Sequence, residues 1–161
     1  MTLNKKPILS VQNLQVEFPT RKGNLVAVND ISFEVNEGEV LGVVGESGAG
    51  KSITGSSIIG LIDPPGRITG GEINFLDQRI DHLSAEEMRT IRGKEIGMVF
   101  QDPLTSLNPL YRIGRQLTET IQTHLHLDDK NARLPSTYLL KLAFLPRKFE
   151  LIIILINFLE V

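Results

Sequence analysis

Residues 45–52 read GESGAGKS, and this stretch decides the fold. Its pattern is a glycine, four further residues, and then Gly50, Lys51 and Ser52. The apolar run EVLGVV at 39–44 precedes it, and a helical pattern continues over 51–62. Glycines let successive backbone amides point toward one anion, and the dipole of the following helix favours negative charge at the same place. The stretch therefore predicts a phosphate-binding loop between a strand and a helix.

The end of this loop indicates which phosphate compound it binds. Lys51 can place a positive charge on the β- and γ-phosphates of a nucleotide, and the Ser52 hydroxyl can coordinate Mg²⁺. Together they predict a nucleoside triphosphate site of the P-loop type. The alternative is a glycine-rich turn with an incidental lysine, which the flanking strand and helix patterns disfavour. The candidate nucleotide-binding residues are Gly45, Glu46, Ser47, Gly48, Ala49, Gly50, Lys51, Ser52 and Ile53.

The rest of the chain reads as short strands and helices separated by turn residues. Runs rich in β-branched residues predict strands, and helical spacing of apolar residues predicts helices. Ser84 with Glu87 three residues later is a capping-box pattern at the start of one short helix. The predicted elements are strands over 8–18, 25–35 and 39–44, a helix over 51–62, a hairpin over 70–80, a helix over 83–92, a strand over 95–100, a polar loop over 101–109 and a helix from about Leu110 to His124.

Composition excludes several classes of protein. The 161 residues suffice for one domain, and the balance of 17 basic against 19 acidic residues argues against a nucleic-acid partner. With no cysteine, disulfides and thiolate metal sites are excluded. The N-terminus lacks the apolar region of an export signal. The apolar tail at 151–159 is shorter than the ~20 residues of a membrane helix, so a buried strand is the better expectation there.

The run IRGKEIGMVFQDPLTSLNPLYRIGRQLTETI at 91–121 resembles the Q-loop region of ABC-transporter ATPase subunits, most of all those of oligopeptide and dipeptide importers. The matching positions are Phe100–Pro103, Ser106–Pro109, Gly114, Gln116 and Glu119. The resemblance extends upstream through AVNDISFEV and the P-loop, and covers roughly residues 9–133. It implies an α/β P-loop NTPase fold, with an antiparallel β subdomain and an incomplete parallel-sheet core. Residues 1–133 would form a partial nucleotide-binding domain, followed by a tail at 134–161 that does not match the family.

The resemblance implies roles for three further residues. Phe18 would be the aromatic residue that stacks on adenine, and Val28 the apolar neighbour that lines the base. Both also fit as ordinary core-facing residues of a β-sheet. Gln101 would be the Q-loop glutamine, which positions Mg²⁺ or the attacking water, and its alternative is a polar residue at a strand end. The histidines and aspartates at 124–129 have no metal-ligand spacing, so we expect no metal site there.

The same resemblance implies the cofactors, partners and location of the protein. ATP and Mg²⁺ would bind at the P-loop. Membrane permease subunits and a second ATPase subunit would be the partners, and the chain would lie peripherally on the cytoplasmic face of the membrane with no transmembrane segment. A complete small P-loop kinase or GTPase is a second interpretation, but neither a phosphoacceptor site nor a guanine-reading loop is evident. A third interpretation is a fragment with a structural role or none.

The family pattern continues through a serine-glycine-glycine signature, a strand ending in aspartate and glutamate, and a switch histidine. None of these follows Gln101 in the 161 residues, so we expect a chain without turnover. Read one base out of frame, codons for 153–161 can encode YPHQFSGG, which is similar to the family's signature region. We hypothesise a frame change near residues 131–134, which would make the tail out of frame. We also expect unpaired apolar strands and a poorly stable, aggregation-prone chain.

Overall fold

The structure is a computed structural model that describes residues 6–100, 108–125 and 152–155. The chain divides into two compact units, Met1–Arg89 and Thr90–Val161, which are described separately below.

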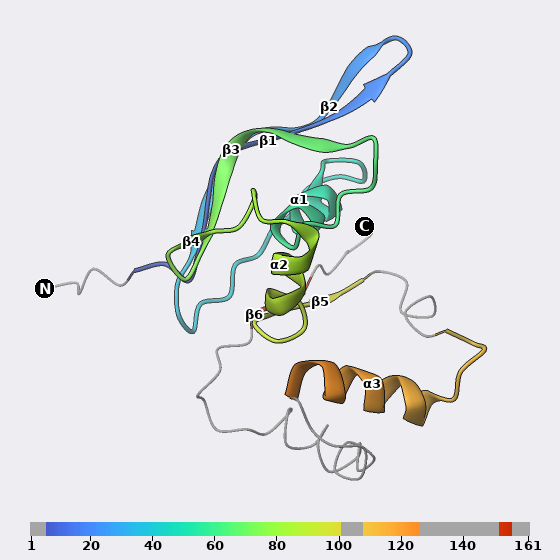
Figure 1. Ribbon diagram of the computed structural model, residues 1–161. Coiled ribbons are helices and arrows are strands. Elements are labelled where there is room, and N and C mark those ends of the chain that lie inside the picture. The colour runs from blue at the N-terminus through green and yellow to red at the C-terminus, as the bar shows by residue number, and fades with distance from the viewer. Residues whose placement is uncertain (1–5, 101–107, 126–151, 156–161) are drawn as a thin grey trace, which may run out of the picture. The chain divides into compact units, whose positions relative to one another are not determined.

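The first unit is built on a four-stranded antiparallel sheet in the order β2-β1-β3-β4 (Figure 1). Its strands are β1 (Leu9–Thr20), β2 (Gly23–Val35), β3 (Arg67–Phe75) and β4 (Gln78–Arg79). The central strand β1 pairs with β2 on one side and with β3 on the other, as the predicted strands and hairpin require. Its apolar residues are part of the core, and both of its edges are hydrogen-bonded to neighbouring strands. The most deeply buried side chains are Leu9, Val11, Leu14, Val16, Ser57 and Ile73.

A bulge bends the long strands near Asn13. The register of β1 shifts there against both β2 and β3, and Asn13 has a positive φ of 48°. The Asn13 side chain donates to Asp30 Oδ1 at 2.8 Å, and its backbone N–H donates to Ser32 Oγ at 2.8 Å. On the other side Gly71, with φ 84°, approaches so closely that a Cβ would lie 2.4 Å from the carbonyl oxygens of Gln12 and Asn13. Only glycine fits this position.

One helix begins with the cap that the sequence predicts. Helix α2 (Ala85–Ile91) begins with a complete capping box, since Ser84 N–H donates to Glu87 Oε2 at 2.8 Å and Glu87 N–H donates to Ser84 Oγ at 3.3 Å. The Ser84 hydroxyl also donates to Glu87 Oε2 at 2.7 Å, and this bond together with that of the Ser84 N–H lowers the pKa of Glu87.

Helix α1 (Lys51–Ile58) ends four residues before the predicted Ile62. Gly60, with φ 63°, donates to the Ser57 carbonyl, and Leu61 N–H donates to the Ser56 carbonyl at 2.7 Å. This pair of bonds is the Schellman motif, which closes the helix. The helical pattern of apolar residues continued past this point, but the glycine stops the helix.

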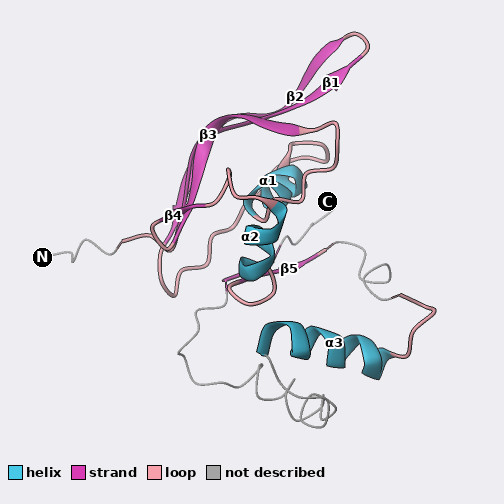
Figure 2. Ribbon diagram, viewed as in Figure 1, coloured by secondary structure: helices cyan, strands magenta, loops and turns pink. Residues whose placement is uncertain are grey.

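The prediction of a strand over 39–44 is wrong for the structure described. The segment is neither strand nor helix, and it is drawn as a loop between β2 and α1 in Figure 2. Val40 is 95% exposed and Val44 is 94% exposed. Among the described residues no neighbouring strand pairs with this segment, and a strand needs such a partner for its backbone groups. The segment is exposed and unpaired in the described chain, but it is not the unpaired strand that was expected.

The second unit contains β5 (Ile96–Val99), α3 (Ile113–Leu125) and β6 (Ile152–Leu155). Strands β5 and β6 pair in parallel, with Ile96 opposite Ile152 and Val99 opposite Leu155. The predicted strand before the polar loop and the predicted helix are therefore both present. A strand is present in the tail over the four residues of β6. Of β5, Ile96 is buried whereas Val99 is 53% exposed.

Candidate functional site

The site begins at the loop that enters α1. Two of its glycines take the left-handed conformation, with φ 83° at Gly48 and 85° at Gly50, and Ala49 N–H donates to the Glu46 carbonyl at 3.1 Å. Helix α1 starts directly after Gly50, and no side chain caps it. An uncapped helix N-terminus offers its first amides and its positive dipole end to an anion. The loop and the helix could therefore accept an anion such as a phosphate group.

Gly50 is held against the sheet. A Cβ at this position would lie 2.6 Å from the Ala27 carbonyl oxygen and 3.3 Å from Val28 Cγ2. The Thr54 hydroxyl also donates to the Gly50 carbonyl at 3.0 Å, in a buried contact within the first turn of α1. Strand β2 therefore positions the end of the loop, and both the positive φ and the close approach demand glycine here.

Lys51 lies across the loop. Its Nζ donates to the carbonyl oxygens of Gly45 at 2.6 Å and Glu46 at 2.7 Å. These two bonds fold the side chain back over the residues that precede the helix. The ammonium group is thus held at the loop, where phosphate oxygens could replace the two carbonyls as acceptors.

The predicted metal ligands are Ser52 and Gln101. Ser52 is exposed in the first turn of α1, and Gln101 lies outside the described residues. The described part of the chain holds no group of three or more acidic, histidine or cysteine side chains that could bind a metal. Mg²⁺ in nucleotide sites takes few protein ligands, because phosphate oxygens and water complete its shell. One serine hydroxyl at the loop fits that kind of site.

The two residues predicted to contact the base lie on the β1–β2 hairpin. Val28 is buried, with 5% of its surface exposed, and packs against Gly50 at the end of the loop. Phe18 is half-buried, and its ring lies against Gly66, where a Cβ would come within 2.5 Å of Phe18 Cε1. The structure therefore brings Val28 to the loop, whereas Phe18 packs against the turn before β3. Both positions are those of side chains that also serve the packing of the sheet.

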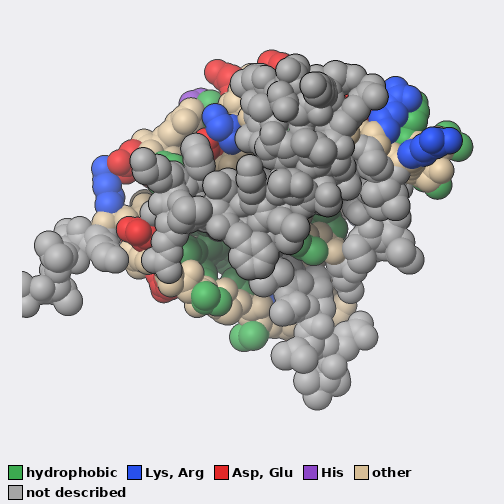
Figure 3. Space-filling model, turned by 90° about the horizontal axis from the view of Figure 1, so that it is seen from below, with side chains coloured by type: hydrophobic (Ala, Val, Ile, Leu, Met, Phe, Trp, Pro, Cys, Tyr) green, Lys and Arg blue, Asp and Glu red, His purple; other side chains and the backbone are tan. Residues whose placement is uncertain are grey.

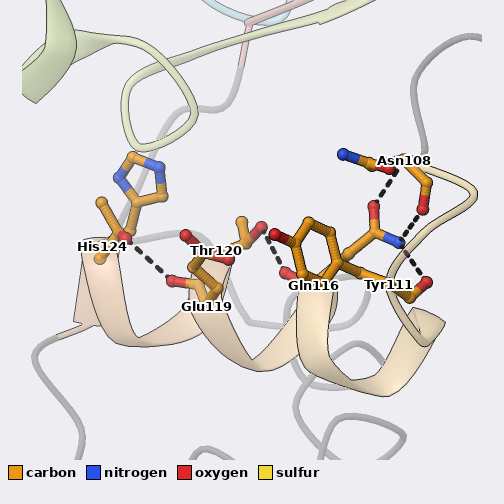
Figure 4. A pocket seen from close by; sticks show the side chains of 7 residues that line it. Asn108, Tyr111, Gln116, Glu119, Thr120 and His124 are labelled. Atoms are coloured by element: carbon orange, nitrogen blue, oxygen red, sulfur yellow. Dashed lines mark hydrogen bonds between the residues drawn. The ribbon is translucent and has the colours of Figure 1, made fainter.

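The second unit carries a polar hollow that sequence reasoning did not identify (Figure 4). Its volume is about 410 Å³, and one face of α3 forms most of its lining. Gln116 holds the preceding turn in place, since its amide accepts from Asn108 N–H at 2.9 Å and donates to the carbonyls of Asn108 and Tyr111 at 2.9 Å. The signal was present, because Gln116 is one of the matching positions of the family pattern, but the sequence did not show which atoms it would bind.

Charged side chains are interspersed on the surface. Lys and Arg side chains and Asp and Glu side chains both occur on the face drawn in Figure 3, and hydrophobic side chains are visible between them. This agrees with the near balance of 17 basic and 19 acidic residues. In the described ranges, no helix combines the length and the apolar character needed to cross a membrane.

The fold resembles those of solved ATP-binding cassettes. A dimeric cassette, MJ0796, solved in a post-hydrolysis state with ADP and Pi, superposes with a TM-score of 0.71 at 24% identity, over 88% of this chain and 60% of that one. The cbiO1 protein of Clostridium perfringens, part of the ABC transporter complex cbiONQ, gives a TM-score of 0.61 at 26% identity, over 85% of this chain and 50% of that one. The predicted fold class is therefore confirmed.

Proteins of similar sequence are found among the ATP-binding proteins of bacterial peptide transport. The oligopeptide transport ATP-binding protein OppD of Bacillus subtilis is 43% identical over 140 residues, which are 86% of this chain and 39% of that protein. The dipeptide transport ATP-binding protein DppD of the same organism is 45% identical over 140 residues, 86% of this chain and 42% of that protein. The DppD of Escherichia coli is 45% identical over 117 residues, 73% of this chain and 36% of that protein. The chain thus spans about two fifths of the length of these relatives.

A family model described as ABC transporter matches residues 28–145, a range that contains the whole of the loop and helix α1. The predicted resemblance is confirmed by this match and by the named relatives. Because the match covers more than half of the sequence, this chain belongs to the ABC transporter family.

Proposed function

We propose that this chain is an ATP-binding subunit, or part of one, of an ABC importer for oligopeptides or dipeptides. The support comes from its similarity to OppD and DppD, at 43% and 45% identity over 140 residues. Since the chain spans about two fifths of those proteins, coupling of ATP hydrolysis to transport belongs to the proposal. Permease subunits in the membrane and a second ATPase subunit are its proposed partners, with the chain on the cytoplasmic face.

The geometry of the loop carries the proposal that ATP binds here. Two left-handed glycines lead into an uncapped helix, and Lys51 lies across the loop with its Nζ on two backbone carbonyls. On binding, the loop amides would donate to phosphate oxygens, and the Lys51 ammonium would exchange its carbonyl acceptors for them.

Two groups of residues complete the proposed site. Ser52 and Gln101 would hold Mg²⁺, which screens the charge between phosphate groups. Phe18 and Val28 would contact the adenine; Val28 lies against Gly50 at the end of the loop, whereas Phe18 packs against Gly66. Exposed aromatic area on Phe18 is needed for stacking, and the half-buried ring retains some.

We further propose that these 161 residues bind ATP without hydrolysing it, because the aspartate, glutamate and histidine that the family uses do not follow Gln101. The division into a nucleotide-binding part at 1–133 and an out-of-frame tail at 134–161 is part of the same proposal. Sequencing the gene tests the division: an alternative frame past residue 131 should continue into an apolar strand ending in Asp-Glu. If it does not, the frame-change hypothesis is wrong.

The experiment for nucleotide binding is calorimetric titration of the full chain with Mg·ATP. Lys51→Ala should weaken binding by about 100-fold, because a charge-assisted contact to phosphate is lost. Lys22→Ala is the matched control, since Lys22 lies in the turn between β1 and β2, and its affinity should equal that of the unchanged chain. Equal binding by the two variants would contradict the proposal.

Competition with GTP and assay of phosphate release separate the remaining interpretations. An ATP site with an apolar base contact should prefer ATP or show little preference, whereas a GTPase would prefer GTP strongly. Release of phosphate by the purified 161-residue chain would contradict the proposed lack of turnover and leave the binding proposal standing.

A further inference from the structure

Thr54 places a hydroxyl group in the buried first turn of helix α1. It is the fourth residue of the helix, and its side chain is buried. Threonine is a weaker helix former than alanine or leucine, and a buried hydroxyl costs free energy unless it is hydrogen-bonded. An aliphatic side chain would avoid both costs. The partner of the Thr54 hydroxyl therefore indicates what this residue contributes.

The partner is the carbonyl group at the end of the loop that enters α1. The Thr54 hydroxyl donates to the Gly50 carbonyl oxygen at 3.0 Å, and the Thr54 N–H donates to the same oxygen at 2.8 Å. A threonine within a helix often bonds the carbonyl four residues earlier. What distinguishes Thr54 is the place of that carbonyl, because Gly50 is the N-cap of the helix.

The Gly50 carbonyl shares a peptide unit with the Lys51 N–H. In a trans peptide the C=O and N–H bonds point in opposite directions. Because the carbonyl is held toward the helix, the N–H of the first helical residue is directed out of the N-terminal end of α1. A donor that fixes the carbonyl thus also fixes the direction in which this N–H can donate to an anion. The hydrogen bond to the carbonyl also polarises the N–H and strengthens it as a donor.

This peptide unit needs a restraint because it follows a glycine. Gly50 has φ 85° and ψ 1°, and a glycine can adopt other backbone conformations at little cost. Strand β2 limits the movement of its Cα, since a Cβ there would lie 2.6 Å from the Ala27 carbonyl oxygen. The Thr54 hydroxyl limits the rotation of its carbonyl. The two restraints act on different parts of the same residue.

We propose that Thr54 is a positioning residue for the phosphate chain of the nucleotide. Its hydroxyl holds the Gly50–Lys51 peptide so that the Lys51 N–H donates to a phosphate oxygen. This inference rests on the proposed function, since it requires an anion at the loop. Thr54 acts through the peptide unit and not by contact with the nucleotide. A donor that is oriented before binding raises affinity, because less freedom is lost when the ligand binds.

Ser57 offers a matched control on the same helix. Its hydroxyl donates to the Ile53 carbonyl oxygen, four residues earlier, at 2.6 Å, and the residue is buried. The Ile53 carbonyl, however, shares its peptide unit with the Thr54 N–H, which donates within the helix to the Gly50 carbonyl. Both hydroxyls therefore make the same kind of hydrogen bond, but only that of Thr54 orients an amide at the N-terminal end of α1.

Calorimetric titration of the full chain with Mg·ATP and with inorganic tripolyphosphate, which carries no base, tests the inference. Thr54→Val should weaken the binding of both ligands by about fivefold to tenfold, whereas Thr54→Ser and Ser57→Ala should keep it. Urea denaturation verifies that each variant is folded. If Thr54→Val does not fold, the comparison of Thr54→Ser with Thr54→Ala replaces it, because these two differ only in the hydroxyl. In the ligand-free chain, the NMR chemical shift of the Gly50 carbonyl carbon should change in Thr54→Val but not in Ser57→Ala.

The outcomes separate this inference from the proposed function. ATP binding that Lys51→Ala weakens but Thr54→Val does not would overturn the role of Thr54 and leave the proposed function standing. Equal losses in Thr54→Val and Ser57→Ala would also overturn it, because they would show a general effect of helix packing. Tripolyphosphate binding that depends on Thr54, with ATP bound no more tightly, would support the inference and contradict an ATP site. If the unchanged chain binds neither ligand, both proposals are wrong.

Discussion

Two apolar stretches of the first unit have similar compositions, but one is buried and the other is exposed. Strand β1 carries Val11, Leu14 and Val16, each with at most 1% of its surface exposed, whereas Val40 and Val44 in the loop before α1 are 95% and 94% exposed. Strand β1 has a hydrogen-bonded neighbour on both sides, and the segment at 39–44 has none in the described chain. A β-branched apolar run thus forms a strand only where partner strands are available to satisfy its backbone.

The difference also concerns function. The paired region positions the loop, because Ala27 and Val28 of β2 pack against Gly50. The unpaired region leads into the same loop from the other side, and ends directly at Gly45. The sheet therefore packs against the end of the loop that leads into helix α1. The segment that precedes the loop is exposed. Variants that change only the paired sheet, or only the segment before the loop, can separate the contributions of the two regions.

The largest expected effect is that of Gly71→Ala. Its φ of 84° is strained for alanine, and the new Cβ would lie 2.4 Å from two carbonyl oxygens of β1. We expect a loss of about 3–4 kcal/mol in the free energy of unfolding, measured by urea denaturation. Gly38→Ala is the matched control, because Gly38 has φ 72° but nothing within 4 Å of the built Cβ. It should cost about 1 kcal/mol from backbone strain alone. Equal losses in the two variants would show that β1 and β3 do not approach this closely.

A pair of valines tests the comparison more directly. Val16→Ala removes two methyl groups from a side chain with no exposed surface, and should cost about 2–3 kcal/mol of unfolding free energy. Val40→Ala makes the same change at a position that is 95% exposed, and should change it by less than about 0.5 kcal/mol. The same denaturation series measures both. A large loss for Val40→Ala in dilute solution would mean that the segment is packed in the folded monomer.

The smallest effect concerns pH. Burial opposes ionisation of Asp81, but the hydrogen bonds from Arg79 and from Ile73 N–H, with the Arg79 charge, outweigh it and lower the pKa below the ordinary value of 3.8. A carboxyl group whose pKa is lower in the folded than in the unfolded state stabilises the fold when the pH is above its unfolded pKa. This contribution is lost as the pH falls through its folded pKa. Acidification below about pH 4 should therefore weaken the β3–β4 end of the sheet.

Asp81→Asn separates this contribution from general acid denaturation. It should cost about 1–2 kcal/mol at neutral pH and make unfolding less sensitive to acid in this range. Glu39→Gln is the control in the exposed segment. The Asn36 backbone and side-chain N–H groups lower the pKa of Glu39 too, but its carboxylate is exposed, so the change in the acid profile should be smaller. Identical profiles for the two variants would contradict the role given to the partly buried Arg79–Asp81 pair.

Much of the fold and site could be predicted from local signals. The capping box at Ser84 and Glu87 was predicted because both partners lie within one helical turn. Helix α1 was predicted too long, since its end depends on the positive φ of Gly60, which helical periodicity does not reveal. The hydrogen bonds of Gln116 to a turn eight residues earlier involve tertiary geometry, and the spacing of the residues could not predict them. The role of Gln101 stays a prediction.

The sequence by itself predicted the candidate phosphate-binding loop, because the glycines, Lys51 and Ser52 lie within eight consecutive residues whose chemistry is local. It also determined which runs favour strands, since β-branched residues and turns are read along the chain. Only the tertiary structure decided that 9–20 forms a buried central strand and that 39–44 remains uncovered. The physical reason is that a strand is completed by its neighbours: hydrogen bonds between strands and burial of both faces depend on which segments lie alongside.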